Sequence, residues 1–72
     1  MLSQEQQILN HLEQHGSITQ AEAMSEYGIM RLASRISHLR GAGHPISSVL
    51  EYGTNRYGRE VRYARYYMEA RA

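Results

Sequence analysis

Two groups of side chains in this sequence are suited to contact with a polyanion. The first follows Gly28 and contains these residues: Arg31, Ser34, Arg35 and His38. The second brackets a polar loop and consists of Arg56 and Arg59. A planar guanidinium donates paired hydrogen bonds to a phosphate or to the N7 and O6 atoms of guanine. All eight basic residues are arginine, so this chemistry is available at each of them.

The charged residues are divided unequally along the chain. Residues 1–29 carry four glutamates and no arginine, whereas residues 30–72 carry all eight arginines and three glutamates. No acidic residue lies between positions 30 and 50. The net charge of +1 therefore combines an acidic first part with a basic second part. We expect the basic part to face an anionic partner.

Capping boxes at residues 3–6 and 19–22 predict two helix starts. In each, a serine or threonine hydroxyl covers one free backbone amide, and a glutamine or glutamate three residues later covers another. The first helix is expected over residues 4–15 with Gly16 as its cap. The second is short and stops at Gly28, because glycine adopts left-handed backbone angles without steric cost. Its residues at the spacing of a buried face are Ala23, Met24 and Tyr27.

A third helix is predicted over residues 30–40, with Gly41 as its cap. The apolar residues that recur at helical spacing in this region are Ile29, Leu32, Ala33, Ile36 and Leu39. If this row is buried, the opposite side of the helix is basic and hydrogen-bonding. That side holds Arg31, Ser34 and His38, with Arg35 on its flank.

The remainder of the sequence predicts a β-hairpin. Residues 46–52 are partly β-branched, residues 60–68 are rich in tyrosine and valine, and the glycine-bracketed loop 53–58 joins them. The short stretch 17–18 is expected to be extended and able to pair with the hairpin. Residues 68–72 are expected to form a frayed tail.

Three helices with a tight glycine turn between the second and third, followed by a hairpin, are typical of a winged helix-turn-helix. The expected fold class is therefore mainly α with a β-hairpin (α+β). We expect one domain over residues 1–72, with an ordered core over residues 3–68. In this architecture the third helix enters the major groove of DNA, and the hairpin loop reaches the neighbouring backbone or the minor groove.

The sequence also resembles the small winged helix-turn-helix proteins that are common in bacteriophages and prophages. The matching segments are Ser17-Ile18-Thr19 with Glu22-Ala23, residues 27–40, Gly43-His44-Pro45-Ile46 and residues 58–66. Together they span about residues 5–68. The resemblance implies DNA binding and regulation of genes or recombination. The long wing tip with its extra tyrosine, Tyr57, departs from the family pattern.

We expect the candidate residues of the third helix to contact different parts of the DNA. Arg31, in the first turn, is expected to contact a base edge. Arg35 is expected on phosphate, and Ser34 suits either contact. His38 either touches DNA or is simply exposed, because a neutral imidazole adds little to counterion release.

In the wing, Arg56 is expected along a narrow minor groove and Arg59 on phosphate. Arg62 and Arg65 are equally suited to cross-strand pairing with Glu51, so they are left outside the candidate DNA-binding set.

Other functional classes are disfavoured. The 72 residues leave no room for a water-poor cleft with nucleophile, base and orienting partner, so no enzyme activity is expected. His11 and His15 stand one helical turn apart but have no third ligand, so no metal or cofactor is expected. The chain has no cysteine, no run of about 20 apolar residues and no signal-like start, which favours the cytoplasm. The resemblance to phage and prophage proteins implies that the cell is bacterial.

The function expected is a sequence-specific double-stranded DNA-binding protein, acting as a phage or prophage transcriptional regulator. A single module buries little area on DNA, so a homodimer or cooperative neighbours are expected. One alternative is an excisionase-like architectural factor in recombination. Another is a protein-binding module that inhibits a host protein through its acidic first and second helices.

Overall fold

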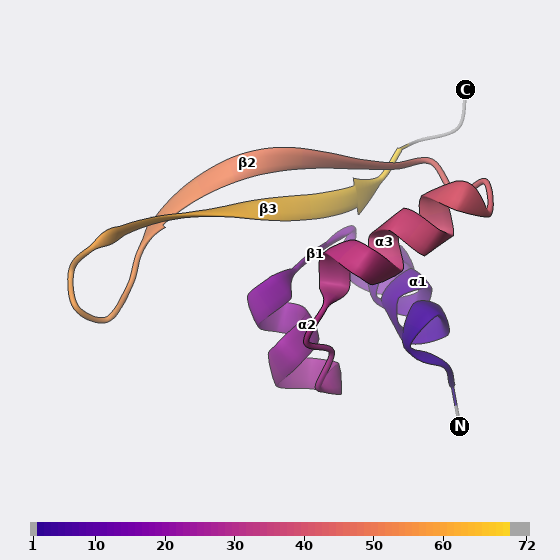
Figure 1. The fold of residues 1–72 in the computed structure, drawn as a ribbon, viewed down its shortest axis with the longest axis horizontal. Coiled ribbons are helices and arrows are strands. Elements are labelled where there is room, and N and C mark those ends of the chain that lie inside the picture. Colours follow the sequence, from indigo (N-terminus) through magenta and orange to yellow (C-terminus); the bar gives the residue numbers. More distant parts are fainter. Residues whose placement is uncertain (1, 70–72) are drawn as a thin grey trace.

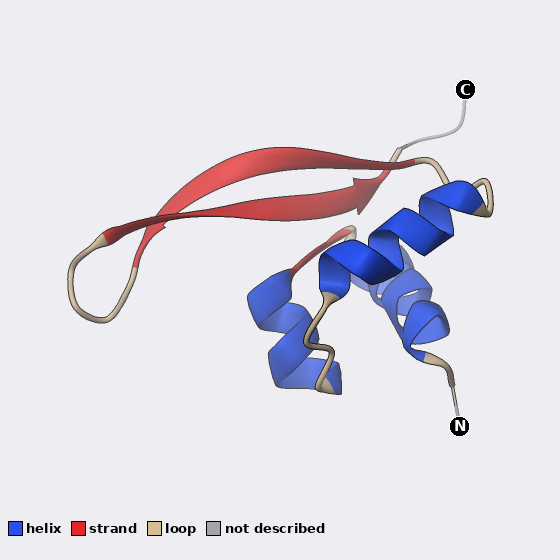
Figure 2. Cartoon of the chain, viewed as in Figure 1, coloured by secondary structure: helices blue, strands red, loops and turns tan. Residues whose placement is uncertain are grey.

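The structure is a computed structural model that describes residues 2–69. Three helices precede a hairpin, and their order along the chain is α1 (Gln4–His15), β1 (Ser17–Thr19), α2 (Gln20–Tyr27), α3 (Leu32–Gly41), β2 (Ile46–Thr54) and β3 (Glu60–Met68). The helices gather at one end of the molecule, and the β2–β3 hairpin projects beyond them along the longest dimension (Figures 1 and 2). Residue 1 and residues 70–72 of the expected tail lie outside the described residues.

The three strands form one antiparallel sheet in the order β1-β3-β2. The hairpin pairs without a break from Ile46 opposite Met68 to Thr54 opposite Glu60. β1 pairs with the other side of β3, with Ile18 opposite Tyr66. The expected fold class is confirmed, including the pairing of residues 17–18 with the hairpin.

The predicted starts and ends of the first two helices are also confirmed. Both capping boxes are formed, and in the second the Thr19 backbone N–H donates to the Glu22 carboxylate at 2.9 Å. Gly16 and Gly28 end α1 and α2 with φ of 85° and 68°. These backbone angles favour glycine, because a Cβ would clash with the following carbonyl.

A single core lies between the helices and the near half of the sheet. Its buried members are Ile8, Leu12, Ile18, Ala23, Ile29, Leu32, Ile36, Leu39 and Ile46. Tyr66 and Met68 of β3 pack against it from the sheet. Full burial of one such aliphatic side chain contributes about 1.5–3 kcal/mol. The core therefore fixes α3 against both α1 and the sheet.

Two predictions of burial were wrong. Ala33 is exposed, and Met24 has 44% of its surface exposed. At 100° per residue, Ala33 lies a quarter turn or more from Leu32, while Ile36 points within about 40° of Leu32. Met24 stands in the same relation to the buried Ala23. Each side chain directly follows a buried residue in the sequence but points away from the side of the helix that faces the core.

Three predicted boundaries also differ from the structure. α3 begins at Leu32 and not at residue 30, and it includes Gly41, the residue expected to cap it. The left-handed glycine after α3 is Gly43, with φ of 101°. β2 continues to Thr54, two residues beyond the expected end, because its pairing with β3 continues to the last pair before the turn.

Candidate nucleic-acid interface

The turn between α2 and α3 is held by the side chain of Gln20. Its Nε2 donates to the Ile29 carbonyl at 2.7 Å, and its Oε1 accepts from the Leu32 N–H at 2.9 Å. The first amide of α3 is thus capped from α2, and Arg31 at the N-cap position makes no side-chain cap hydrogen bond. Arg31 has φ of −126° and ψ of 65°, outside helical values, which is why α3 starts later than predicted.

Gln20 was missed by sequence reasoning. Its partners lie nine and twelve residues away, so no local pattern marks its role. The Leu32 N–H needs an acceptor, which the Gln20 amide oxygen supplies and a guanidinium, having only donors, cannot. The Arg31 guanidinium is therefore not engaged in the turn. Among residues 2–69 it has no hydrogen-bond or ion-pair partner, and Arg31 and its neighbour Met30 are both exposed.

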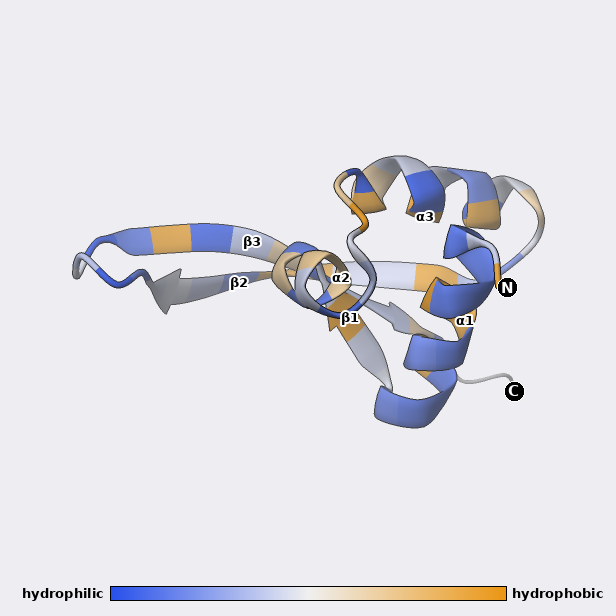
Figure 3. Ribbon diagram, turned by 90° about the horizontal axis from the view of Figure 1, so that it is seen from below, coloured by the Kyte–Doolittle hydropathy of each residue, from blue (hydrophilic) through white to orange (hydrophobic). Residues whose placement is uncertain are grey.

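The outer side of α3 is formed by small and polar side chains. α3 forms the upper margin of the molecule in Figure 3, above α1 and α2. Ala33 and Ser37 are both exposed and stand one helical turn apart, whereas Ser34 is half-buried. Small side chains allow the helix backbone to approach a groove closely, and an alanine methyl can contact the methyl group of thymine. Sequence reasoning missed Ser37 and placed Ala33 in the core.

Arg35 and His38 are directed to an acidic residue of α1. Glu5 Oε2 lies 3.6 Å from Arg35 Nη1 and 3.6 Å from His38 Nδ1. The Arg35 and Glu5 side chains remain 38% and 36% exposed, so water and salt screen the pair. Arg35 is therefore ion-paired in the unbound protein, and His38 lies beside the same carboxylate. Both stay at the surface, where a phosphate can compete with Glu5 for them.

The wing tip presents two further arginines on an ordered turn. Asn55 Oδ1 accepts from the backbone N–H groups of Tyr57 and Arg59 at 2.9 and 3.0 Å. The Asn55 N–H donates to the Arg59 carbonyl at 2.9 Å, which closes the hairpin. Arg56 and Arg59 are exposed, and within residues 2–69 neither guanidinium has a partner. Tyr57 is 80% exposed at the same tip.

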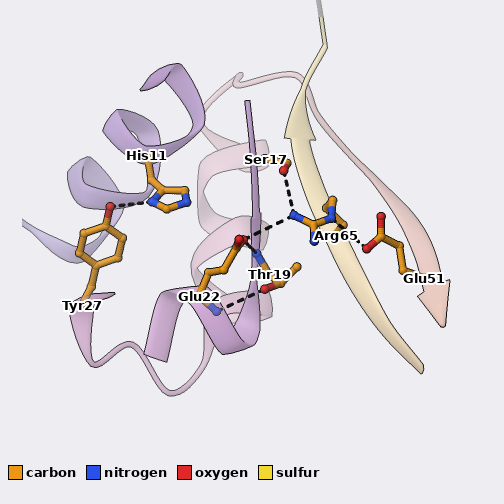
Figure 4. A network of polar contacts seen from close by, with 7 residues as sticks. All are labelled: His11, Ser17, Thr19, Glu22, Tyr27, Glu51 and Arg65. Carbon is orange, nitrogen blue, oxygen red and sulfur yellow. Dashed lines mark hydrogen bonds and ion pairs between the residues drawn. The ribbon is translucent and has the colours of Figure 1, made fainter. Parts of the chain in front are cut away.

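Two other arginines stabilise the fold. Arg65 Nε donates to Glu51 Oε1 at 2.9 Å, and Arg65 Nη1 lies 3.0 Å from the Ser17 hydroxyl and 3.5 Å from Glu22 (Figure 4). The hydrogen bond to Glu51 raises the pKa of the guanidinium against the opposing effect of burial. The pairing of Arg65 with Glu51, one of the two roles left open from the sequence, is thus observed. Arg40 donates to the Ile46 carbonyl at 2.8 Å and lies over the Tyr66 ring.

The two histidines of α1 make contacts within the fold. His11 is buried, and its Nδ1 shares a hydrogen bond of 2.7 Å with the Tyr27 hydroxyl (Figure 4). The His15 ring packs beside it, with ring centroids 4.5 Å apart. Within the described residues, no group of three or more potential metal ligands comes together. In that part of the chain no helix is long and apolar enough to cross a membrane.

Comparison with known proteins agrees with the geometry of the turn, α3 and the hairpin. The sequence profile of a family described as "Winged helix-turn-helix domain" matches residues 3–71. A search of curated proteins found no match.

Proposed function

The chain belongs to the winged helix-turn-helix family, and from this premise we propose that it is a sequence-specific double-stranded DNA-binding protein. We propose further that it regulates transcription for a phage or prophage within a bacterial cell. The winged helix-turn-helix is a DNA-binding fold and is typically non-enzymatic. The observation that carries the proposal is the exposed Arg31 guanidinium, which stands without a partner in residues 2–69 at the start of α3.

The proposed contacts divide into base reading and phosphate binding. Arg31 contacts a base edge, for which the paired acceptors of guanine are the best match. The side chains of Ala33 and Ser37 are small and exposed, so the α3 backbone can lie close to the floor of the major groove. Ser34 is close enough to this side of α3 to add a hydrogen bond to a base or a phosphate. Arg35 and His38 exchange Glu5 for phosphate on binding.

The wing supplies the second point of attachment. Arg56 enters the adjacent minor groove, and Arg59 contacts phosphate. The backbone of the turn is held by Asn55, so little backbone freedom is lost when they bind. Arg40 and Arg65 are engaged within the fold, and we propose no DNA contact for them.

Selection of bound DNA from a random duplex pool tests the proposal, followed by titration of the selected site at several salt concentrations. A recurrent motif is expected. With Arg35 and Arg59 on phosphate and Arg56 between the phosphates of the minor groove, the logarithm of the binding constant should fall with the logarithm of salt with a slope of about −2 to −3. Enrichment of no motif refutes sequence-specific reading. Tandem direct repeats beside an attachment site would identify a recombination factor, and capture of a host protein without DNA binding at low salt would identify an inhibitor.

A further inference from the structure

The outer edge of β2 carries unpaired backbone groups. In an antiparallel ladder, every second residue exchanges both its N–H and C=O with the neighbouring strand. The Asn55 N–H donates to Arg59 and the Glu69 N–H donates to Pro45, so the odd-numbered residues of β2 bond to β3. The even-numbered residues therefore point these groups outward. They are Ile46, Ser48, Leu50, Tyr52 and Thr54.

Only the first of these outward residues has its groups satisfied. The Ile46 N–H donates to the His44 carbonyl, and the Ile46 carbonyl accepts from Arg40. From Ser48 to Thr54, no hydrogen-bond partner occurs on this edge within residues 2–69. In Figure 1, β2 forms the upper margin of the molecule and the helices lie on its other side. The edge is therefore accessible along the length of the hairpin.

The side chains along this edge favour pairing. Val49, Leu50 and Tyr52 are 44%, 57% and 61% exposed, although all three are apolar or aromatic. The strand has no proline, lysine or bulge, which are the features that usually prevent edge-to-edge association. Its one charged residue, Glu51, is paired with Arg65 across the sheet.

The opposite edge of the sheet differs in charge. β1 pairs with β3 only at residues 65–67, so β3 has no neighbouring strand on that side over residues 60–64. That open stretch contains Glu60 and Arg62, both exposed. Charged side chains of this kind protect an edge from pairing. The β2 edge carries no such unpaired charge, and the net charge of +1 per chain leaves little repulsion between copies.

We propose that the β2 edge pairs with the β2 edge of a second copy of this chain, in antiparallel orientation, about a two-fold axis at Leu50. Leu50 then faces Leu50 of the other copy, and Ser48 faces Tyr52. Three such pairs make six backbone hydrogen bonds. This register also avoids placing the two Glu51 side chains opposite each other, as an axis at Glu51 would.

The dimer has a defined shape and strength. A two-fold axis between antiparallel strands is perpendicular to the sheet, so the helices of both copies lie on the same face of a six-stranded sheet. The wing-tip turn 55–59 lies beyond the paired residues and stays free. The contact is smaller than the standard interface of about 1,600 Å². We therefore expect a weak dimer, with Kd on the order of micromolar or above.

Sedimentation equilibrium of the full chain without DNA tests this pairing, because it does not depend on the proposed function. The apparent mass should rise from 8.3 kDa towards twice that value as concentration increases. Leu50→Lys should raise the dimer Kd at least about tenfold, because like charges then face each other across the axis. The matched control is Met24→Lys, the same kind of change at an exposed methionine of α2, and it should leave Kd unchanged.

Disulfide trapping supplies a second readout that needs no charge change. The chain has no cysteine, and residues in a hydrogen-bonded antiparallel pair have Cα atoms about 5.5 Å apart, within disulfide range. Leu50→Cys should therefore cross-link to a covalent dimer under mild oxidation, and Met24→Cys should not. Wild-type protein that stays monomeric up to its solubility limit overturns the proposal, leaving the edge for a strand of another protein. A dimer equally weakened by both lysine variants also overturns it.

Discussion

Replacing Glu5 by glutamine should strengthen DNA binding. Glu5 Oε2 lies 3.6 Å from both Arg35 Nη1 and His38 Nδ1 on α3. When α3 meets a phosphate backbone, Arg35 must leave this carboxylate or bring it close to the phosphates. Either course reduces affinity. Glutamine keeps the size and helix propensity of glutamate while it removes the charge.

The size of this effect follows from the exposure of the pair. Both side chains are more than a third exposed, and ion pairs of this kind contribute about 0.2–1 kcal/mol to stability. Recovery of that energy on DNA corresponds to a Kd about 1.4- to 5-fold lower for Glu5→Gln. The gain should shrink as salt rises, since the Debye length falls from about 10 Å at 0.1 M to about 3 Å at 1 M.

Fluorescence anisotropy with a labelled duplex measures this change. The matched control is Glu13→Gln, which removes one negative charge from the exposed surface of the same helix, at a residue that has no ion pair within the described chain. It should change Kd less than Glu5→Gln does. If Glu5→Gln instead weakens binding relative to this control, Glu5 holds Arg35 in its binding position and does not compete with DNA. That result would refute the reasoning.

Three further substitutions distinguish residues that stabilise the fold from residues that contact DNA. Gln20→Ala should destabilise the fold by about 1–3 kcal/mol, because it leaves the buried Ile29 carbonyl and Leu32 N–H unpaired. Thermal unfolding should show a Tm lower by at least about 4 °C. An unchanged Tm would contradict the capping role of Gln20. Arg65→Met should lower the Tm while leaving the salt slope of DNA binding unchanged, because the guanidinium is hydrogen-bonded to Glu51 within the fold. A reduced slope would place Arg65 on DNA. Arg59→Ala should weaken binding to all duplexes alike and reduce the slope by about one, because Arg59 is placed on phosphate; an unchanged slope in a salt titration would remove this contact.

Local signals predicted where α1 and α2 begin and end. A capping box is complete within four residues, and a left-handed glycine follows directly from the end of a helical pattern. Both capping boxes, Gly16 and Gly28 could therefore be predicted. The fold class followed from the order of these segments and the hairpin pattern, neither of which depends on distant contacts.

Contacts between distant segments could not be predicted in the same way. Gln20 caps a helix that begins twelve residues later, and Glu5 reaches Arg35 because α1 and α3 pack across each other. Neither relation leaves a spacing pattern in the sequence. The exposure of Ala33 could not be predicted for another reason. Alanine next to the buried Leu32 fits the apolar pattern of the helix, and only the side on which α3 packs leaves Ala33 exposed to solvent.

The central claim is that Arg31, at the start of α3, reads a base in the major groove. The most direct measurement is the base preference at each position of the selected site, compared between wild type and Arg31→Ala, with Arg62→Ala as the control for loss of one exposed arginine. We predict that Arg31→Ala costs about 1–3 kcal/mol and relaxes the preference at one position, while Arg62→Ala keeps the full motif. An unchanged motif with uniform weakening in Arg31→Ala would contradict the claim.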